Sequence, residues 1–403
     1  MASSTPFGKL PVSAAADIRP YELHVPDADI KHMQDLLKLS PIAGPIYENS
    51  LPNGDSSLGV RRDWLIEAKR VWETEFDWRA TEARVNSFPN FHVSIEDKIG
   101  TFNMHFAALF SSKPDAVPVV LLHGWPGSFL EFLPMFELFR EKYTPETLPY
   151  HLVIPSLPGF TLSGIPQLSH DISQIDVGRI VDSLMKRIGF GTGYVAQGGD
   201  VGSRVSRIIA VDHEACKGES IVNFCAIGRP ASATDDSKLS PIEQDGLKRL
   251  EAWKATETAY ALEHGTKPST IGFVLGSSPI ALLSWIGEKF LAWVDAPLPL
   301  NTILESVSLY WLTRSAHSSL WSYRHSYGPR PLPHDDPRYY IKIPLGYSYF
   351  AKELIPIPID WVATTGNLIW RRMHEQGGHF AALEQPKEFM DDLEAFIAHV
   401  WKA

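Results

Sequence analysis

Apolar residues recur along this chain in two patterns, and each pattern predicts a different element. At Phe91, Val93 and Ile95, and again over residues 102–106, they alternate with polar residues, as expected of a half-buried hairpin. Val117–Leu122 is instead a continuous apolar run, which is typical of a parallel strand covered on both faces. Shorter runs of the same kind follow at Leu152–Ile154, Tyr194–Ala196 and Ile221–Ala226. These segments predict a sheet made largely of parallel strands.

Helical patterns separate these strands. Ile180, Val181, Leu184 and Ile188 form one stripe at helical spacing, and Gly189 follows where helices commonly end in a left-handed residue. Because strands and helices alternate, we expect an α/β protein with a mostly parallel, doubly wound sheet.

The alternation begins and stops at definite points, which divide the chain into four segments. Residues 1–90 are predicted to be a wrapping segment of loops and short helices, one of them capped by Asp27. Residues 91–227 are the first part of the sheet core, and residues 228–340 are mostly helical and rich in Leu, Trp and Tyr. Strand and helix patterns return over residues 341–403. A helical block inserted between two late strands predicts a cap over one sheet.

Composition limits the class of protein. The 403 residues carry a net charge of −10 without a Lys/Arg cluster, which disfavours a nucleic-acid partner. The two cysteines, Cys216 and Cys225, exclude a disulfide scaffold and fit a reducing cytosol. No apolar run approaches the roughly 18 residues of a membrane helix, and the N-terminus does not resemble a signal peptide, so we expect a soluble cytoplasmic protein. The 12 Trp, 13 Tyr and 20 Phe point to a large aromatic core or pocket.

The most informative motif follows the predicted strand at 194–196. Gly198-Gly199-Asp200-Val201-Gly202 places a sharp turn of small residues between a strand and a helix, which is the form of a nucleophile elbow. The usual motif has Ser where this chain has Asp200. A carboxylate suits displacement at saturated carbon and leaves an alkyl-enzyme ester, which water must then hydrolyse. The alternative is an Asp that only caps the helix, and the flanking strand, helix and glycines favour the elbow.

Hydrolysis of such an ester needs a general base and an acid that orients it. His379 lies in a loop between the last predicted strand and the final helix, where the nucleophile–acid–histidine order of this elbow places the base. Glu353 follows the strand after the cap and is the predicted acid. Asp360 is the alternative, but it falls in the first turn of a helix that opens at Pro358, where a carboxylate is ordinary.

The same step needs an oxyanion hole, which backbone N–H groups can form. The first N–H is expected from Val201, the residue after the nucleophile. The second is expected from Trp125, in the His123–Ser128 loop that follows the third predicted strand. Pro126 has no N–H and cannot donate, although it would stiffen the loop.

Two other motifs fail as cofactor sites. His374 and His379 are five residues apart, rather than the four of a zinc-binding helix. Residues 189–193 contain three glycines, but they lack the dinucleotide-binding spacing and precede a strand instead of following one. No cofactor and no metal are therefore expected.

Together, the Asp elbow, the segment Gly377–Phe380 and the His-Gly-Trp-Pro-Gly-Ser loop at 123–128 resemble the epoxide hydrolases of the α/β-hydrolase superfamily. Within them the chain is similar to the microsomal-type branch, especially its soluble fungal members. The resemblance covers nearly the whole chain, and it implies an α/β-hydrolase fold with an inserted helical cap and an N-terminal wrapping segment. It implies Asp200 as the nucleophile, His379 as the base and Glu353 at the acid position, where members have either Asp or Glu.

The resemblance also implies two cap tyrosines that hydrogen-bond the epoxide oxygen and supply its proton. By local context they match Tyr260 and Tyr323. Without the resemblance, the sequence does not separate these two from the other tyrosines of the region, which are Tyr310, Tyr327, Tyr339 and Tyr340. Core packing is the alternative role for each of them.

The resulting hypothesis is hydrolysis of a small apolar epoxide to a vicinal diol. A dehalogenase acting on haloalkanes or haloacids would use the same nucleophile, but those enzymes often carry a Trp halide donor beside it, where this chain has Val201. A hydrolase-fold protein that binds a ligand without turnover is the third interpretation. Such proteins commonly lose part of the triad, whereas all three members are present here. The natural substrate and the oligomeric state stay open, and no sequence feature requires or excludes a homodimer.

Overall fold

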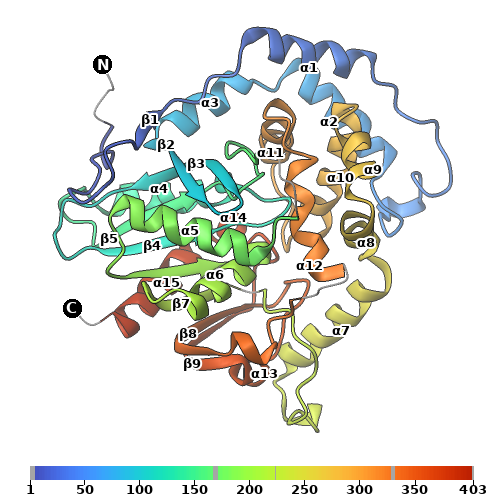
Figure 1. The fold of residues 1–403 in the computed structure, drawn as a ribbon. Helices are drawn as coiled ribbons and strands as arrows, with labels where there is room; N and C mark the ends of the chain where they lie inside the picture. Colours follow the sequence, from blue (N-terminus) through green and yellow to red (C-terminus); the bar gives the residue numbers. More distant parts are fainter. Residues whose placement is uncertain (1–4, 167–170, 223, 328–331, 402–403) are drawn as a thin grey trace.

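The computed structural model describes residues 5–166, 171–222, 224–327 and 332–401, and these residues surround a nine-stranded mixed sheet (Figure 1). The strands in chain order are β1 (Arg19–Tyr21), β2 (Asn90–Asp97), β3 (Gly100–Leu109), β4 (Val117–Leu122), β5 (Tyr150–Pro155), β6 (Tyr194–Gly198), β7 (Cys216–Val222), β8 (Ile341–Phe350) and β9 (Gly366–His374). The predicted hairpin is confirmed as β2 and β3, and all of β2 pairs with residues 100–107 of β3.

The sheet is antiparallel on one side and parallel on the other. Its strand order is β1-β2-β3-β5-β4-β6-β7-β8-β9. The pairs from β1 to β5 are antiparallel, and the pairs from β5 to β9 are parallel. The carboxyl ends of the parallel strands therefore share one edge, which is where ligands bind in sheets of this kind.

Helices cover the sheet and extend away from it on one side. The α-helices are α1 (Asp27–Leu39), α2 (Arg62–Thr74), α3 (Trp78–Asn86), α4 (Leu133–Lys142), α5 (Gln174–Ile188), α6 (Asp200–Asp212), α7 (Pro241–Thr256), α8 (Ala259–Thr266), α9 (Pro268–Leu275), α10 (Pro279–Ala292), α11 (Leu300–Leu312), α12 (Arg324–Tyr327), α13 (Ile359–Val362), α14 (Ala381–Glu384) and α15 (Pro386–Val400). Short 3₁₀ helices span Pro52–Gly54, Phe129–Phe132, Asp236–Lys238, Ser318–Tyr323, Pro337–Tyr339 and Ala363–Thr365.

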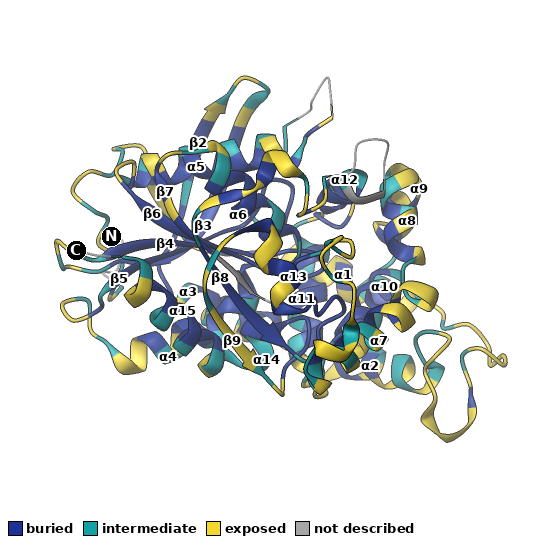
Figure 2. Ribbon diagram, turned by 90° about the horizontal axis from the view of Figure 1, so that it is seen from below, coloured by how far each residue is buried: buried dark blue, intermediate teal, exposed yellow. Residues whose placement is uncertain are grey.

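The strands are buried on both faces, which explains their continuous apolar runs. In β4, Val120 and Leu122 belong to the core cluster that includes residues of α5 and α6, whereas Val119 and Leu121 belong to the cluster on the α4 and α15 side. Alternate side chains of one strand thus fill two separate cores, so neither set is polar. Figure 2 shows the central strands as buried and places most exposed residues on outer helices and loops.

The cap and the N-terminal segment pack against each other. Between β7 and β8 the described residues form helices α7 to α12 and no strand. Helix α1 contacts α10 and α11, and α3 also contacts α11 (Figure 1). The Trp72 indole N–H donates to Ser308 Oγ at 2.9 Å, between α2 and α11. The segment limits predicted from the sequence, 1–90, 91–227, 228–340 and 341–403, stay predictions.

The structure differs from the sequence-based expectations in two local features. Arg19–Tyr21 forms an edge strand on β2 that no apolar pattern indicated, because its pairing is through backbone groups and its side chains are largely exposed. The Val117–Leu122 strand is consequently the fourth of the chain and not the third. The prediction that Asp27 caps this helix was wrong, because Pro26 occupies the N-cap position and Asp27 is the first helical residue of α1.

The predicted end of α5 is confirmed, since Gly189 has φ of 108° and donates its N–H to carbonyls of the last turn. Among the described residues, no single helix is both long enough and apolar enough to cross a membrane. The pair α9 and α10 passes that test only when joined across a bend of 114°.

Candidate active site

The predicted elbow lies at the end of β6, on the edge where the parallel strands end. Asp200 opens α6 with φ of 46°, a left-handed conformation that is uncommon for a residue with a side chain. The turn is tight: a Cβ on Gly202 would stand 2.1 Å from the Leu122 carbonyl oxygen of β4. The backbone of β4 therefore leaves no room for a side chain at residue 202. The Asp200 carboxylate lies at the edge of the sheet where the parallel strands end.

The loop at residues 123–128 follows β4 and is called the oxyanion loop below, after its predicted role; it holds one oxygen of this carboxylate. The Trp125 N–H donates to Asp200 Oδ1 at 2.8 Å, and the Val201 N–H also donates to the carboxylate. The loop approaches so closely that a Cβ on Gly124 would lie 2.0 Å from Asp200 Oδ1. The two predicted oxyanion donors thus converge on one carboxylate, and preorganised N–H groups of this kind stabilise developing negative charge.

His379 reaches the same carboxylate from the loop between β9 and α14. Its Nε2 lies 3.6 Å from Asp200 Oδ2, and its Nδ1–H donates to Glu353 Oε1 at 2.7 Å. The loop is held to the cap, because the His379 N–H donates to the Trp293 carbonyl at 2.8 Å. Glu353 follows β8 and is fully buried, and its Oε1 also accepts the Leu354 N–H at 2.6 Å. The structure therefore brings the three predicted triad members together in hydrogen-bonding order.

The charges of the site reinforce one another. Burial raises the pKa of Asp200, but the hydrogen bond and charge of His379 and the two backbone N–H groups outweigh it and hold the pKa below the usual range. Burial lowers the pKa of His379, but the charges and hydrogen bonds of Glu353 and Asp200 outweigh it and raise the pKa to about 10. The resting site thus contains an ionised Asp200 next to a protonated His379.

A cavity of about 180 Å³ opens over Asp200 and extends to the cap. Its lining residues are Asp200, Val201, Arg204, Phe224, Ala226, Trp253, Tyr260, Ser322, Tyr323 and Ile355. Tyr260 in α8 and Tyr323 at the end of a 3₁₀ helix are 8% and 7% exposed, and their ring centroids lie 5.6 Å apart. Trp125 stacks on Tyr260 at 5.5 Å. Both predicted cap tyrosines therefore line the same cavity as Asp200.

The alternative residues lie elsewhere. Asp360 is exposed in the first turn of α13. The Tyr310 hydroxyl donates to the Gly127 carbonyl at 2.8 Å, which ties α11 to the oxyanion loop. Tyr339 and Tyr340 lie at the 3₁₀ helix before β8, and the side chain of Tyr327 is outside the described part of the structure.

Two side chains near the site were missed by the sequence analysis. Burial raises the pKa of Glu131 to about 8, so this carboxyl is protonated at neutral pH beside the oxyanion loop. His264 is fully buried, and its ring lies 5.6 Å from that of Tyr260 and 4.8 Å from that of Tyr323. His264 is four residues after Tyr260, a helical spacing that gives the only sequence signal for it.

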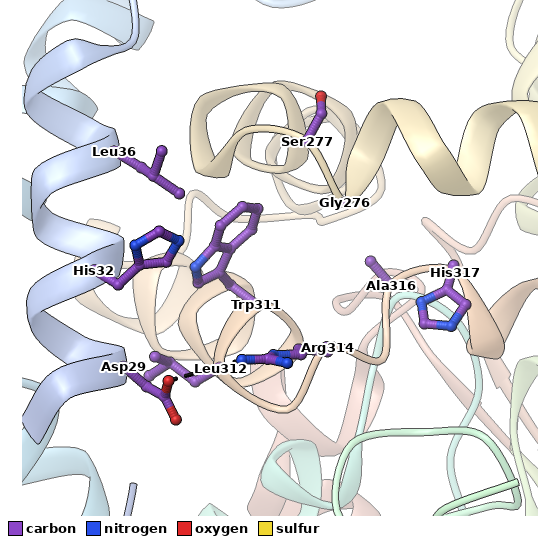
Figure 3. Close-up of a pocket in the computed structure, with 10 residues that line it drawn as sticks. All are labelled: Asp29, His32, Leu36, Gly276, Ser277, Trp311, Leu312, Arg314, Ala316 and His317. Atoms are coloured by element: carbon purple, nitrogen blue, oxygen red, sulfur yellow. Dashed lines mark ion pairs between the residues drawn. The ribbon is translucent and has the colours of Figure 1, made fainter. Parts of the chain in front are cut away.

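A larger cavity, of about 510 Å³, lies apart from these residues between α1 and the cap (Figure 3). It is lined by Asp29, His32, Leu36, Gly276, Ser277, Trp311, Leu312, Arg314, Ala316 and His317. It contains none of the predicted site residues. Among the residues that the structure describes, no group of three or more His, Cys, Asp or Glu side chains is arranged to hold a metal ion.

Comparison with known protein families places two models on this chain. A model described as "Epoxide hydrolase N terminus" matches residues 18–132, and the model of the alpha/beta hydrolase fold matches residues 117–270. The first covers the N-terminal segment and the oxyanion loop, and the second covers the elbow and the start of the cap.

Individual relatives cover almost the whole chain. A protein of Dothistroma septosporum named "Putative epoxide hydrolase" is 43% identical over 97% of this chain and 92% of its own. The solved structure of Aspergillus niger epoxide hydrolase is 50% identical, covers 98% of this chain and 100% of its own, and superposes with a TM-score of 0.93. The juvenile hormone epoxide hydrolase of the silkworm Bombyx mori, at 24% identity and a TM-score of 0.81, shares the fold.

Proposed function

Because this chain belongs to the epoxide hydrolase family of the α/β-hydrolase fold, we propose that it converts an epoxide to a vicinal diol through a covalent ester on Asp200. The observation that carries the proposal is an ionised carboxylate on a strand–turn–helix elbow, held by two N–H donors, in one cavity with two buried tyrosines. We propose Asp200, His379 and Glu353 as the triad, with Tyr260 and Tyr323 as the groups that activate the epoxide oxygen.

Ring opening is the first step. An oxygen of the Asp200 carboxylate attacks one ring carbon, the bond from that carbon to the epoxide oxygen breaks, and an alkyl ester forms. The departing oxygen takes a proton from the hydroxyl of Tyr260 or Tyr323. A phenol with an ordinary pKa near 10 is neutral at physiological pH and can donate to an alkoxide without prior ionisation.

Ester hydrolysis is the second step, and the first step prepares it. Esterification removes the charge of Asp200, which is one of the two charges that raise the pKa of His379. The pKa of His379 therefore falls, its proton leaves to solvent, and the neutral imidazole can accept a proton from water. The hydroxide attacks the ester carbonyl, and the N–H groups of Trp125 and Val201 hold the oxyanion. Glu353 stabilises the imidazolium that forms. The tetrahedral intermediate then collapses: the bond from the carbonyl carbon to the diol oxygen breaks, that oxygen takes the imidazolium proton, and the Asp200 carboxylate is regenerated. Solvent returns a proton to the tyrosinate that ring opening left.

The walls of the cavity support a small apolar substrate. Phe224, Trp253 and Ile355 are apolar and line the space beside the nucleophile. A mostly apolar pocket with a few polar groups orients a ligand without requiring charge on it. We therefore propose aromatic and aliphatic epoxides without charged groups as substrates, to be compared by the rate of diol formation.

Isotope transfer tests the covalent step. A single turnover in ¹⁸O-water is expected to leave ¹⁸O in the Asp200 carboxylate, because water attacks the ester carbonyl and not the substrate carbon. Peptide mass spectrometry locates the label, with Asp200→Ala as the inactive control. An unlabelled Asp200 after many turnovers contradicts the mechanism. Halide release from haloalkanes without diol formation from styrene oxide would instead support a dehalogenase.

A further inference from the structure

A lysine lies buried against one of the two proposed proton donors. Lys289, in α10, is 3% exposed, and its Nζ stands 4.3 Å from the ring centroid of Tyr260. The same ammonium lies 5.6 Å from the ring of Trp293 and 5.9 Å from that of Trp285. Three aromatic rings therefore lie around one positive charge next to the proposed active site. Lys289, Tyr260, Trp285 and Glu288 also line a second cavity, of about 770 Å³.

Most of the Lys289 side chain is withdrawn from bulk water, although it also lines the second cavity. Burial of a charge is unfavourable unless a partner compensates it. Lys289 forms an ion pair with its neighbour Glu288, whose side chain is 31% exposed and so remains partly in water. Cation–π contacts with the rings supply the remaining compensation. An apolar side chain of the same length would fill this space without the desolvation cost, so a charge here calls for a role beyond packing.

Among the described residues, the rings that contact the Tyr260 ring carry no competing positive charge, and Arg204 is a further cationic side chain that lines the same cavity. Burial, with the nearby Lys289 charge, lowers the pKa of His264 to about 3, so its imidazole is neutral. Its Nε2 accepts the Trp285 indole N–H at 2.9 Å, which fixes the remaining ring proton on Nδ1. Trp125, Trp293 and Tyr323 present neutral rings. Asp200 lines the same cavity as Tyr260 and carries the negative charge that the first step consumes.

We propose that Lys289 is a positioning residue for ring opening: its ammonium, held over the ring of Tyr260, stabilises the negative charge that develops on the phenol oxygen. In that step the Tyr260 O–H bond breaks, a new O–H bond forms on the epoxide oxygen, and the electron pair stays on Tyr260. A nearby cation lowers the energy of the resulting tyrosinate more than that of the neutral phenol. The inference rests on the proposed function, because it assumes Tyr260 as a proton donor.

The role predicts an effect on one step only. Lys289→Met keeps much of the side-chain volume and removes the charge, and we expect the rate of ester formation to fall roughly tenfold, the scale of a desolvated cation–π contact. Ester hydrolysis needs no proton from Tyr260, so its rate constant is expected to stay unchanged. Acid-quenched single turnovers with styrene oxide, followed by intact-protein mass spectrometry, measure both rates.

The melting temperature of Lys289→Met distinguishes a role of Lys289 in catalysis from a role in structural stability. Because Met fills much of the same space and the partner Glu288 is already 31% exposed, the melting temperature is expected to change little. Lys142→Met is the matched control, since Lys142 also lies over a tyrosine ring, that of Tyr143 at 5.2 Å, and also pairs with a glutamate. Lys289→Arg retains the charge and is expected to restore most of the ester-formation rate.

Glu288→Gln is a second variant, and it is expected to shift the Tyr260 phenol pKa in the direction opposite to Lys289→Met. This test remains valid even if Lys289→Met does not fold. Glu288→Gln removes the counter-charge, so the field of Lys289 on Tyr260 becomes stronger. In a Tyr323→Phe background, the pKa of the Tyr260 phenol, followed by tyrosinate absorbance against Tyr260→Phe, is expected to fall in Glu288→Gln. It is expected to rise by about one unit in Lys289→Met.

The outcomes distinguish this inference from the proposed function. If the parent protein forms an Asp200 ester and Lys289→Met forms it at the same rate, the role of Lys289 is wrong and the mechanism stands. Equal loss of ester formation and ester hydrolysis also overturns it, as does a phenol pKa that moves in the same direction in both variants. If the parent protein forms no ester, the proposed function itself fails.

Discussion

At the scale of single residues, the two oxygens of the Glu353 carboxylate have unequal roles. Oε1 accepts hydrogen bonds from His379 and from the Leu354 N–H, whereas Oε2 is buried and has no hydrogen-bond partner among the described residues. A buried carboxylate that is only partly hydrogen-bonded is expensive to maintain. The position therefore indicates that its charge serves the neighbouring imidazole more than it serves stability.

Glu353→Gln is expected to retain the shape of the site and lose this charge. The imidazolium that forms during ester hydrolysis then lacks its stabilising partner, and kcat falls by roughly 10²- to 10⁴-fold. The alkyl ester should accumulate, because ring opening does not require the base, and acid-quenched mass spectrometry detects it. Asp360→Asn is the control: Asp360 is exposed on α13, and this variant is expected to keep full activity. A Glu353→Gln protein with unchanged kcat would contradict the assignment.

The raised pKa of His379 predicts a pH dependence of stability. A pKa raised in the folded protein stabilises it fully below the unfolded value of about 6.5, and this contribution disappears as the pH rises through about 10. The melting temperature of the parent protein minus that of His379→Gln is therefore expected to be largest near pH 6. It should shrink by several degrees toward pH 10. Calorimetry across this range measures the difference, and a constant difference would show that the folded-state pKa is not raised.

At the scale of elements, the elbow depends on close contact between α6 and β4. Gly202→Ala places a Cβ within 2.1 Å of the Leu122 carbonyl oxygen, and backbone atoms cannot rotate away as a flexible side chain can. We expect loss of activity and a fall in unfolding free energy of at least about 2 kcal/mol, as for overpacked core sites. Activity and denaturant unfolding are the measurements. Gly44→Ala is the matched control, because nothing lies within 4 Å of the Cβ position there.

At the scale of the whole molecule, the N-terminal segment is joined to the cap by a buried contact. Trp72 of α2 is 2% exposed, and its indole N–H donates to Ser308 of α11. Residues before the sheet thus pack against residues of the insertion that covers the site. We therefore expect the N-terminal segment to stabilise the position of the cap helices.

Trp72→Ala tests this contact. Removing a buried Trp and leaving Ser308 without its donor is expected to cost about 3–5 kcal/mol of unfolding free energy. Denaturant unfolding followed by circular dichroism measures it. Phe273→Ala is the control, since Phe273 is 80% exposed and its truncation should change stability by less than about 0.5 kcal/mol. Equal effects of the two variants would mean that the N-terminal segment is not integral to the fold.

Local patterns account for what could be predicted. The hairpin, the α5 stripe and the elbow each depend on residues adjacent in the chain, so periodicity and small-residue spacing were sufficient for them. β1 was not predicted, because a short edge strand pairs through its backbone and leaves no apolar pattern in the sequence. Asp27 was misassigned because side-chain type alone does not determine which residue takes the cap position.

The candidate site divides in the same way. By itself, the sequence determined that an Asp stands on a strand–turn–helix elbow and that a His and a Glu follow in the order this elbow requires, because these are properties of chain order and local geometry. Only the tertiary structure decided that Lys289 lies over the Tyr260 ring and that Trp125 stacks on that ring. The contact of Trp125 with Tyr260 joins a cap helix to the loop after β4, more than a hundred residues away in the chain, and packing of that range leaves no periodic trace in the sequence.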